Sequence, residues 1–419
     1  MMIVQQIAFL AILVIAAYFI TKRVRFIRAN IALGKSEPLT GDSSRRWNNV
    51  LLVALGQKKM FKRPLPAIFH IFIYVGFLVI NIEVLEFIID GLAGTHRIFK
   101  PFLGGFYFVL MNIFELLAVL VLLACLVFLW RRNVQRVPRL QSPELTGWPR
   151  MDANLILITE IVLMCAIFTM NATDHDGPFF FSSFIAPVFS SLSDHAKATI
   201  ERIAWWVHII GILGFALYVT YSKHLHIFMA FLNTYYARLE PKGEMHNMPV
   251  VTREVKSMLG LPPDANAPFG EPGRFGAKDV NDLARVHLMA AYSCTECGRC
   301  TSECPANITG KKLSPRKVMM DVRDRMEDLG NGLNKEKFLL GDYITKEEIN
   351  ACTSCNACVE ACPVLINPLD IILELRRYVA MEESGSPAQW NSMFQNVETN
   401  FAPWKFPAAD RFNWAKNIQ

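Results

Sequence analysis

Residues 293–305 read SCTECGRCTSECP, and residues 351–363 repeat the pattern as ACTSCNACVEACP. In both stretches three cysteines stand three residues apart, a fourth follows after four more residues, and a proline comes directly behind it. Structural zinc sites usually take separated pairs of cysteines or of cysteine and histidine, so this spacing disfavours zinc. Three thiolates from one tight turn instead suit three corners of an iron–sulfur cube, as in bacterial proteins with [4Fe–4S] clusters.

The fourth iron of each cluster needs a thiolate from outside the turn. In two-cluster proteins with this spacing, it comes from the last cysteine of the other motif. We therefore predict that each motif lends its last cysteine to the other cluster. The predicted ligands of cluster one are Cys294, Cys297, Cys300 and Cys362, and those of cluster two are Cys352, Cys355, Cys358 and Cys304.

Helices are expected to follow both motifs. Ser314 and Pro315 stand where an N-cap and the first helical residue belong, and residues 367–379 repeat this arrangement. The 47 residues between the two sets of cysteines are expected to form a helical insert. We predict an α-helical ferredoxin-like domain with two [4Fe–4S] clusters over residues 281–380.

The rest of the chain is unusually apolar for a carrier of such motifs. Of its 419 residues, 52% are hydrophobic and 19% are charged, whereas a soluble globular chain carries about 25% charged residues. The net charge of +6 is modest and does not suggest a nucleic-acid partner. Eight of the ten cysteines belong to the two motifs, so metal binding in a reducing compartment is a better interpretation than a disulfide framework.

Five segments approach or exceed the roughly 20 apolar residues that a membrane-crossing helix needs. These segments are residues 2–20, 67–90, 103–130, 154–171 and 203–222. The first lacks the basic region and the cleavage site of a signal peptide, so we expect it to be retained. We predict a mainly α fold in which residues 1–240 form a five-helix transmembrane domain. An additional helix at 44–61 is expected to lie at the cytoplasmic membrane surface.

Basic residues predict the orientation of these spans. Eleven Lys and Arg residues lie in 21–66 and five in 131–153, whereas the connections on the other side carry three or four. The N-terminus is therefore expected outside the cytoplasmic membrane, and the cysteine motifs are expected in the cytoplasm, with the basic connections in contact with anionic lipid on the inner face. Residues 241–280 are predicted to be a linker, and residues 381–419 a C-terminal tail.

Histidines at membrane depth are costly and are therefore candidates for a function. His70 lies near the cytoplasmic start of the second span and His208 near the outer start of the fifth, with His224 and His226 at the cytoplasmic end of the fifth. Neutral imidazoles from two helices suit axial ligation of haem b. At about 100° per residue, His208 and His226 would share one helix face. We predict a haem between His70 and His226 or His224; hydrogen bonding to backbone carbonyls is the alternative role.

A second haem would use His208, but its partner is not evident. The matching position on the second span holds Ile80 beside Asn81, and His96 lies in the outer connection. Further polar residues at membrane depth are suited to proton exchange with a quinone, although pairing between helices is the favoured interpretation. They are Asn81, Glu83, Glu86, Asn112, Glu115 and Glu160.

Two stretches, SSRRWNNVLLVALGQKKMFKRPLPAIFHIFIYVGFLV and WWVHIIGILGFALYVTYSKHLHI, resemble the haem b membrane domain of the nitrate reductase gamma subunit. The stretch ITKEEINACTSCNACVEACPVLINPLDIILELRRYV resembles the iron–sulfur domain of heterodisulfide-reductase-like and glycolate-oxidase-like proteins. Their fusion resembles membrane iron–sulfur oxidoreductases, including those proposed to link electron-transfer flavoprotein to menaquinone. The resemblance covers about residues 40–130 and 200–380.

This resemblance implies haem ligation by His70, His208 and His226, while the fourth ligand position of the gamma-subunit pattern is not histidine here. Fused relatives continue into domains with adjacent cysteines, and this sequence contains no such pair. The resemblance therefore implies a catalytic module on a separate polypeptide, for which the tail at 381–419 is a candidate docking segment.

The expected function is that of a membrane-anchored electron-transfer subunit of a quinone-dependent respiratory oxidoreductase. Its expected cofactors are two [4Fe–4S] clusters and one or two haem b groups, with menaquinone or ubiquinone as substrate. The expected partners are a cysteine-rich heterodisulfide-reductase-like subunit, electron-transfer flavoprotein, or both. The alternatives are a stand-alone heterodisulfide or hydroxy-acid oxidoreductase, and a redox sensor or anchor without turnover.

Overall fold

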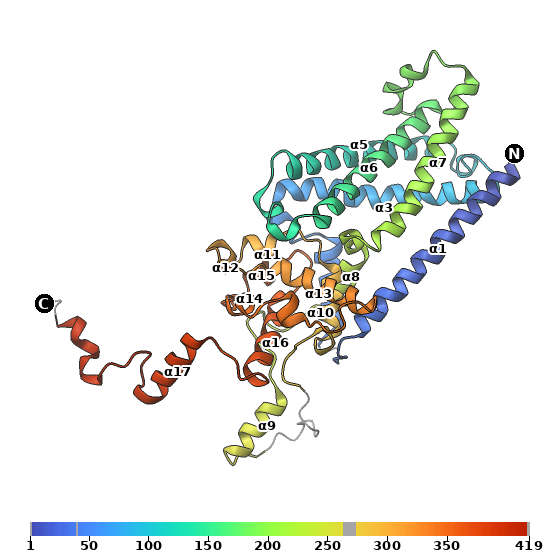
Figure 1. The fold of residues 1–419 in the computed structure, drawn as a ribbon. Coiled ribbons are helices and arrows are strands. Elements are labelled where there is room, and N and C mark those ends of the chain that lie inside the picture. Colours follow the sequence, from blue (N-terminus) through green and yellow to red (C-terminus); the bar gives the residue numbers. More distant parts are fainter. Residues whose placement is uncertain (1, 39–40, 263–273, 417–419) are drawn as a thin grey trace.

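The computed structural model describes residues 2–38, 41–262 and 274–416, and it is built from helices (Figure 1). Within these ranges there is no β-strand, and extended pairing is limited to isolated bridges such as that between Lys35 and Ala284. The mainly α fold predicted from the sequence is confirmed.

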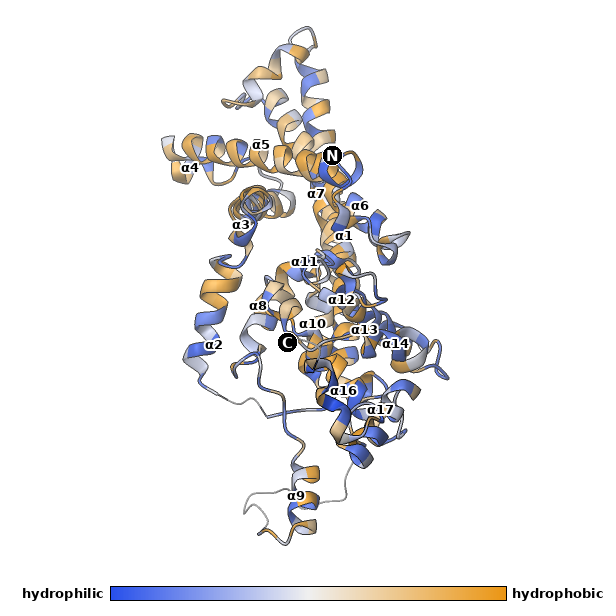
Figure 2. Ribbon diagram, turned by 90° about the vertical axis from the view of Figure 1, so that its left-hand side faces the viewer, coloured by the Kyte–Doolittle hydropathy of each residue, from blue (hydrophilic) through white to orange (hydrophobic). Residues whose placement is uncertain are grey.

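Five helices in the described part of the chain are long and apolar enough to cross a membrane, as predicted. They are α1 (Met2–Ala32), α3 (Pro64–Ala93), α5 (Gly105–Asn133), α6 (Trp148–Thr173) and α7 (Asp194–Val219). Figure 2 shows apolar residues concentrated on these helices. Many of their large apolar side chains are exposed, which is the property of a surface that faces lipid rather than water.

The spanning helices pack in sequence order. Helix α3 packs along α5, α5 along α6, and α6 along α7. Gly76 of α3 stands against Val121 of α5, and Gly211 of α7 stands against Leu163 of α6, at distances that leave no room for a Cβ atom. Small residues at such contacts let helix backbones approach closely in a membrane.

Helix α1 continues beyond the predicted end of the first span and reaches the iron–sulfur domain. Arg23 donates two hydrogen bonds to the carboxylate of Glu327, at 2.9 and 2.7 Å. Asn30 donates to the Tyr292 hydroxyl at 2.9 Å. The hydropathy pattern predicts the end of the span near residue 20. It does not reveal the continuation of the helix, because the residues that α1 contacts there lie about 300 positions away in the sequence.

The fifth span ends earlier than predicted. Helix α7 stops at Val219, a 3₁₀ turn follows at Lys223–Leu225, and α8 (His226–Tyr236) begins a new direction. The expectation that His208 and His226 share one face of one helix is therefore wrong. The break is stabilised by tertiary contacts, because Asp152 of α6 accepts the Lys223 backbone N–H at 3.1 Å.

The iron–sulfur domain lies at one end of the bundle (Figure 1). Its helices are α10 (Arg285–Ser293), α11 (Arg299–Ser302), α12 (Pro305–Ile308), α13 (Pro315–Gly330), α14 (Lys346–Asn350), α15 (Ala357–Ala361) and α16 (Pro368–Met381). Ser314 caps α13 as predicted, accepting the Lys317 N–H at 3.4 Å. The core extends further back than residue 281, because Ala277 is fully buried and donates its N–H to Glu374 at 2.9 Å.

The remaining helices are short and lie at the periphery. They are α2 (Ser43–Asn49), which runs on into a π-helical turn at Val50–Leu55, α4 (Lys100–Leu103), α9 (Pro249–Met258) and α17 (Ala388–Asn400). The predicted surface helix at 44–61 thus ends before Gly56. Helix α9 falls in the predicted linker, of which residues 263–273 lie outside the described residues. Helix α17, in the predicted tail, extends away from the body of the molecule (Figure 1).

Candidate iron–sulfur and haem sites

The two cysteine motifs fold into matching loops. Glu296 and Ser354, each two residues after the first cysteine, have positive φ angles of 55° and 54°. Gly298 and Asn356, two residues further on, have φ angles of 72° and 61°. Glycine and asparagine tolerate this left-handed conformation best. The repeated reversals turn the first three cysteines of each motif toward a common point.

The first three cysteines of the first motif meet the last cysteine of the second. Cys294, Cys297, Cys300 and Cys362 line one cavity of about 30 Å³. Burial, together with charge on Glu296, Cys297 and Cys362, raises the pKa of the Cys294 thiol to about 12. A buried thiol of this kind loses its proton when its sulfur binds a metal centre, because the positive metal stabilises the thiolate. The Ile366 N–H also donates to the Cys362 sulfur at 3.2 Å.

The second set of thiols is assembled in the same crossed manner. Cys304 of the first motif lies near Cys352 and Cys358 of the second, and charge on Cys352 or on Cys304 adds to the effect of burial on the pKa of Cys358. That pKa is raised to about 12. Cys355 completes the set and is exposed to solvent. All ten cysteines of the chain are free thiols, so both sets have the composition that a [4Fe–4S] cluster requires.

The loop of the first set is fastened to the membrane bundle. Arg139, from the connection between α5 and α6, donates to the Cys297 carbonyl at 2.7 Å. Arg316 of α13 is fully buried and bridges this connection, donating to the Arg139 carbonyl and to Glu144, each at 2.6 Å. The Lys223 ammonium, at the start of the turn after α7, pairs with Glu296.

A second group of contacts fixes the same loop to the segment before α3. Arg299 donates to the Lys59 carbonyl at 3.1 Å, and Arg63 donates to Ser302 and Glu303, each at 2.9 Å. The first thiol set therefore faces the bundle, and the second has an exposed ligand. The sequence pattern did not predict which thiol set faces the bundle, because Arg63 and Arg139 served there only as indicators of membrane orientation.

Three of the four candidate haem ligands gather beside this contact. The rings of His224 and His226 have centroids 5.3 Å apart, and the His226 Nδ1 lies 3.2 Å from the Lys223 carbonyl. Burial, together with charge on His226 and on His70 of α3, lowers the pKa of His224 to about 3. Burial also lowers the pKa of His226 to about 4. These imidazoles are thus held neutral, the form that ligates haem iron.

His208 lies apart from this group and lines a large cavity. The cavity has a volume of about 710 Å³ and is lined by residues of α1, α3, α5, α6, α7, α8 and α10. Its lining is almost entirely apolar, with Asn81, Glu160 and His208 among the few polar residues. The His208 Nδ1 lies 3.1 Å from the Leu163 carbonyl, and its buried Nε2 has no hydrogen-bond partner among the described residues. The ring therefore donates from Nδ1 and leaves a lone pair on Nε2.

Other polar residues within the bundle differ in their partners. Glu86 accepts from the Tyr107 hydroxyl at 2.8 Å, and Glu115 accepts from Asn171 at 3.1 Å. These contacts fit the favoured interpretation of pairing between helices. Glu83 is buried, and neither of its carboxylate oxygens has a hydrogen-bond partner within the described ranges.

Comparison with known proteins agrees with the cysteine geometry. A 4Fe-4S dicluster domain family matches residues 293–366. The "Probable iron-sulfur-binding oxidoreductase FadF" of Bacillus subtilis is 28% identical over 99% of this chain and 61% of its own length. The "EtfAB:quinone oxidoreductase" of Syntrophomonas wolfei is 28% identical over 89% of this chain and 54% of its own length. This chain thus spans between half and two thirds of these two curated relatives.

A "Probable membrane-anchored ferredoxin" of Chromohalobacter salexigens is 28% identical over 37% of this chain and 25% of its own length. No solved structure matches. With five apolar helices ahead of the cysteine motifs, the similarity indicates a membrane protein. The chain carries a 4Fe-4S dicluster domain and is a homologue of iron–sulfur electron-transfer oxidoreductases.

Proposed function

We propose that this chain is a membrane electron-transfer subunit that connects its iron–sulfur clusters to a quinone pool through haem b. One observation carries the proposal: the first thiol set is fastened to the bundle where the histidines gather. Lys223 pairs with Glu296, which lies between Cys294 and Cys297, and the next residue after Lys223 is His224. This ion pair joins the first cysteine loop to the segment that carries two of the proposed haem ligands.

The residues present fit the proposed groups. Each [4Fe–4S] cluster would take four thiols from the crossed sets, and the haem would take His70 with His226 or His224. When bound, these groups supply one-electron redox chemistry, while the protein sets their position and surroundings.

The cavity beside His208 is the proposed quinone site. Its volume of about 710 Å³ falls in the range of small-molecule pockets, and its apolar lining suits a quinone ring and tail. The free Nε2 of His208 would accept a hydrogen bond from a hydroquinone hydroxyl, and Glu160 offers a carboxylate for proton exchange. His208 is the one histidine in the described lining of this cavity, which favours a quinone over a second bis-histidine haem.

The orientation proposed from the basic residues is consistent with the contacts. The two Lys- and Arg-rich connections, represented by Arg63 and Arg139, contact the iron–sulfur domain. We therefore place this domain in the cytoplasm and the N-terminus outside. Exposed Cys355 marks the side where a flavoprotein or a heterodisulfide-reductase-like subunit would approach cluster two.

Optical spectroscopy of the purified full chain in detergent tests the proposal. The wild-type protein should show a b-type haem spectrum that a short-chain menaquinol reduces. His70→Ala should abolish the haem spectrum while the iron of both clusters remains. Comparison of His224→Ala with His226→Ala identifies the second ligand.

His195→Ala is the matched control, because His195 is an exposed histidine outside these sites. It should retain the haem. Wild-type protein that contains both clusters but lacks haem after expression with excess haem would refute the proposal. So would full haem content in the His70→Ala variant.

A further inference from the structure

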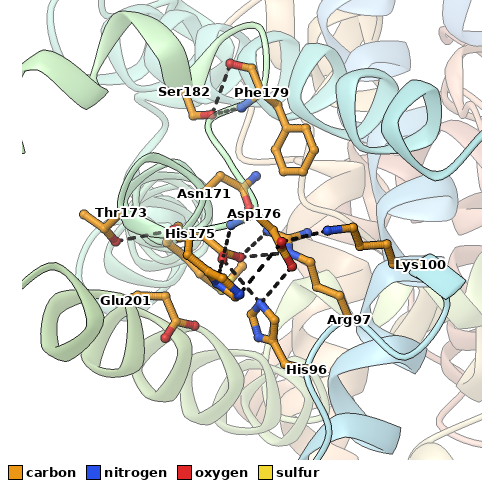
Figure 3. A network of polar contacts seen from close by, with 12 residues as sticks. His96, Arg97, Lys100, Asn171, Thr173, His175, Asp176, Phe179, Ser182 and Glu201 are labelled. Carbon is orange, nitrogen blue, oxygen red and sulfur yellow. Dashed lines mark hydrogen bonds and ion pairs between the residues drawn. The ribbon is translucent and has the colours of Figure 1, made fainter. Parts of the chain in front are cut away.

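Two connections at the end of the bundle opposite the iron–sulfur domain bring a cluster of potential metal ligands together. His96 follows α3, and residues 174–176 follow α6 directly. One ligand atom from each of His96, Asp174, His175 and Asp176 lies within 4.8 Å of all the others. Figure 3 shows the side chains from the two connections converging.

The spacing of these atoms matches a tetrahedral ion. Zinc bonds of about 2.0–2.1 Å to nitrogen and oxygen place neighbouring ligand atoms about 3.3–3.4 Å apart in a tetrahedron. The Asp174 Oδ1 lies 3.0 Å from the His175 Nδ1 and 3.3 Å from the His96 Nε2. The His96 Nε2 lies 3.8 Å from the Asp176 Oδ2. The first two separations are close to the tetrahedral value, and the third is about 0.4 Å longer.

Each carboxylate also bonds a basic side chain, and the Asp176 Oδ1 that does so lies 3.8 Å from the His175 Nε2. Arg97 bonds the Asp174 Oδ2 at 2.7–2.8 Å, and Lys100 bonds the Asp176 Oδ1 at 2.7 Å. Arg97 is itself fixed by Tyr107, at 3.1 Å. These cations hold the carboxylates in orientation and leave the Asp174 Oδ1 and the Asp176 Oδ2 for a metal, as outer partners of metal ligands commonly do.

The Asp174 Oδ1 is crowded when hydrogen bonds are its only interactions. It faces both histidine nitrogens and also accepts the Asp176 N–H at 3.0 Å. A carboxylate oxygen offers about two lone-pair positions, so three donors exceed its capacity. A cation between the Asp174 Oδ1 and the two imidazoles would satisfy all of these groups at once. Asp174 is buried whereas His175 is largely exposed, so the site has a rigid base and an open side.

We propose that His96, Asp174, His175 and Asp176 form a binding site for a divalent transition metal, with zinc as the best-matched ion. Nitrogen and carboxylate ligands in tetrahedral arrangement are characteristic of zinc. The ion would join the α3–α5 connection to the α6–α7 connection. Because the ligands belong to the native arrangement, zinc would stabilise the folded chain in proportion to its affinity.

Zinc titration of the full chain in detergent, followed by elemental analysis after desalting, tests the proposal. The wild-type protein should retain one zinc ion per chain. His96→Ala and His175→Ala should each lower the affinity at least tenfold, the order of loss expected for weakened metal coordination. His175 is the safer position to change, because its side chain is 78% exposed.

His195→Ala should bind zinc like the wild type, since His195 lies outside the cluster. Iron is measured in the same samples as a control. If zinc binds to cluster cysteines that have lost their iron, the iron content falls as the zinc content rises. Stoichiometric zinc with full iron content, lost in the two variants, supports the site. Zinc that binds equally to the wild type and to a His96→Ala, His175→Ala double variant overturns it, as does wild-type protein that retains none.

Discussion

Replacement of Gly298 by alanine should selectively weaken the first cluster site. Gly298 has a φ angle of +72°, which costs an alanine about 1–2 kcal/mol. An added Cβ would also lie 2.5 Å from the Arg316 Nη1 and 2.9 Å from the Arg139 carbonyl oxygen. Arg316 is fully buried and bonded to Glu144, so it has little freedom to withdraw. Overpacking of this kind costs about 1–3 kcal/mol, for a total of about 2–5 kcal/mol.

Gly310→Ala is a matched control in the same domain. Gly310 has a φ angle of +83°, but no atom lies within 4 Å of the position that its Cβ would occupy. This variant should therefore carry only the backbone term of about 1–2 kcal/mol. The difference between the two variants isolates the contact between the first cysteine loop and the bundle.

Chemical unfolding monitored by circular dichroism, with iron content and low-temperature electron paramagnetic resonance, measures the effect. Gly298→Ala should unfold at lower denaturant concentration than Gly310→Ala and lose the signal of cluster one first. Its iron should fall from about eight atoms per chain toward about four, since each cluster holds four. Equal iron content and equal unfolding midpoints in the two variants would show that the contact of Gly298 with Arg316 and Arg139 does not stabilise the first cluster site.

Three further predictions concern the ligands, the cavity and the pH dependence. Cys304→Ala should remove the spectrum of cluster two and leave that of cluster one, although Cys304 belongs to the first motif; loss of cluster one alone would contradict the crossed assignment. Ala216→Trp should fill part of the cavity beside His208. The rate of haem reduction by quinol should then fall at least tenfold while the haem content stays unchanged. Stopped-flow absorbance measures this rate, and an unchanged rate would exclude the cavity as the quinone site. Asp282 is partly buried, which opposes ionisation, but the Lys278 N–H and the Arg274 guanidinium hold the pKa of its carboxyl below the usual range. A lowered pKa stabilises the folded state at pH values above the unfolded pKa of about 3.9. The difference in unfolding free energy between wild type and Asp282→Asn should therefore stay constant from about pH 8 to 5 and shrink as the pH falls below about 4. Denaturant titrations across this range measure the difference, and one that grows on acidification would contradict the prediction.

Local patterns predicted much of this molecule. Five hydrophobic segments became five long helices, because a helix that lies in lipid satisfies its backbone within itself and needs only apolar side chains. Ser314 capped its helix as predicted, because a cap depends on residues within one turn. By contrast, the sequence did not predict the positive φ angles of Glu296 and Ser354. These residues occupy the same position in the two cysteine motifs, and the shared cysteine spacing explains why both have this conformation.

The two cysteine motifs and the apolar spans follow from the amino-acid pattern alone, since both depend on residues that are close neighbours in the chain. The choice of the thiol set that faces the bundle and the end of the fifth span depend instead on contacts between segments that are distant in the sequence. Lys223 contributes to both outcomes, because its backbone N–H donates to Asp152 and its side chain pairs with Glu296, 73 residues further along the chain. A buried ammonium requires a charged partner, and no local pattern identifies that partner. The same long-range pairing brought the histidines beside the first cysteine loop and separated His226 from the helix of His208.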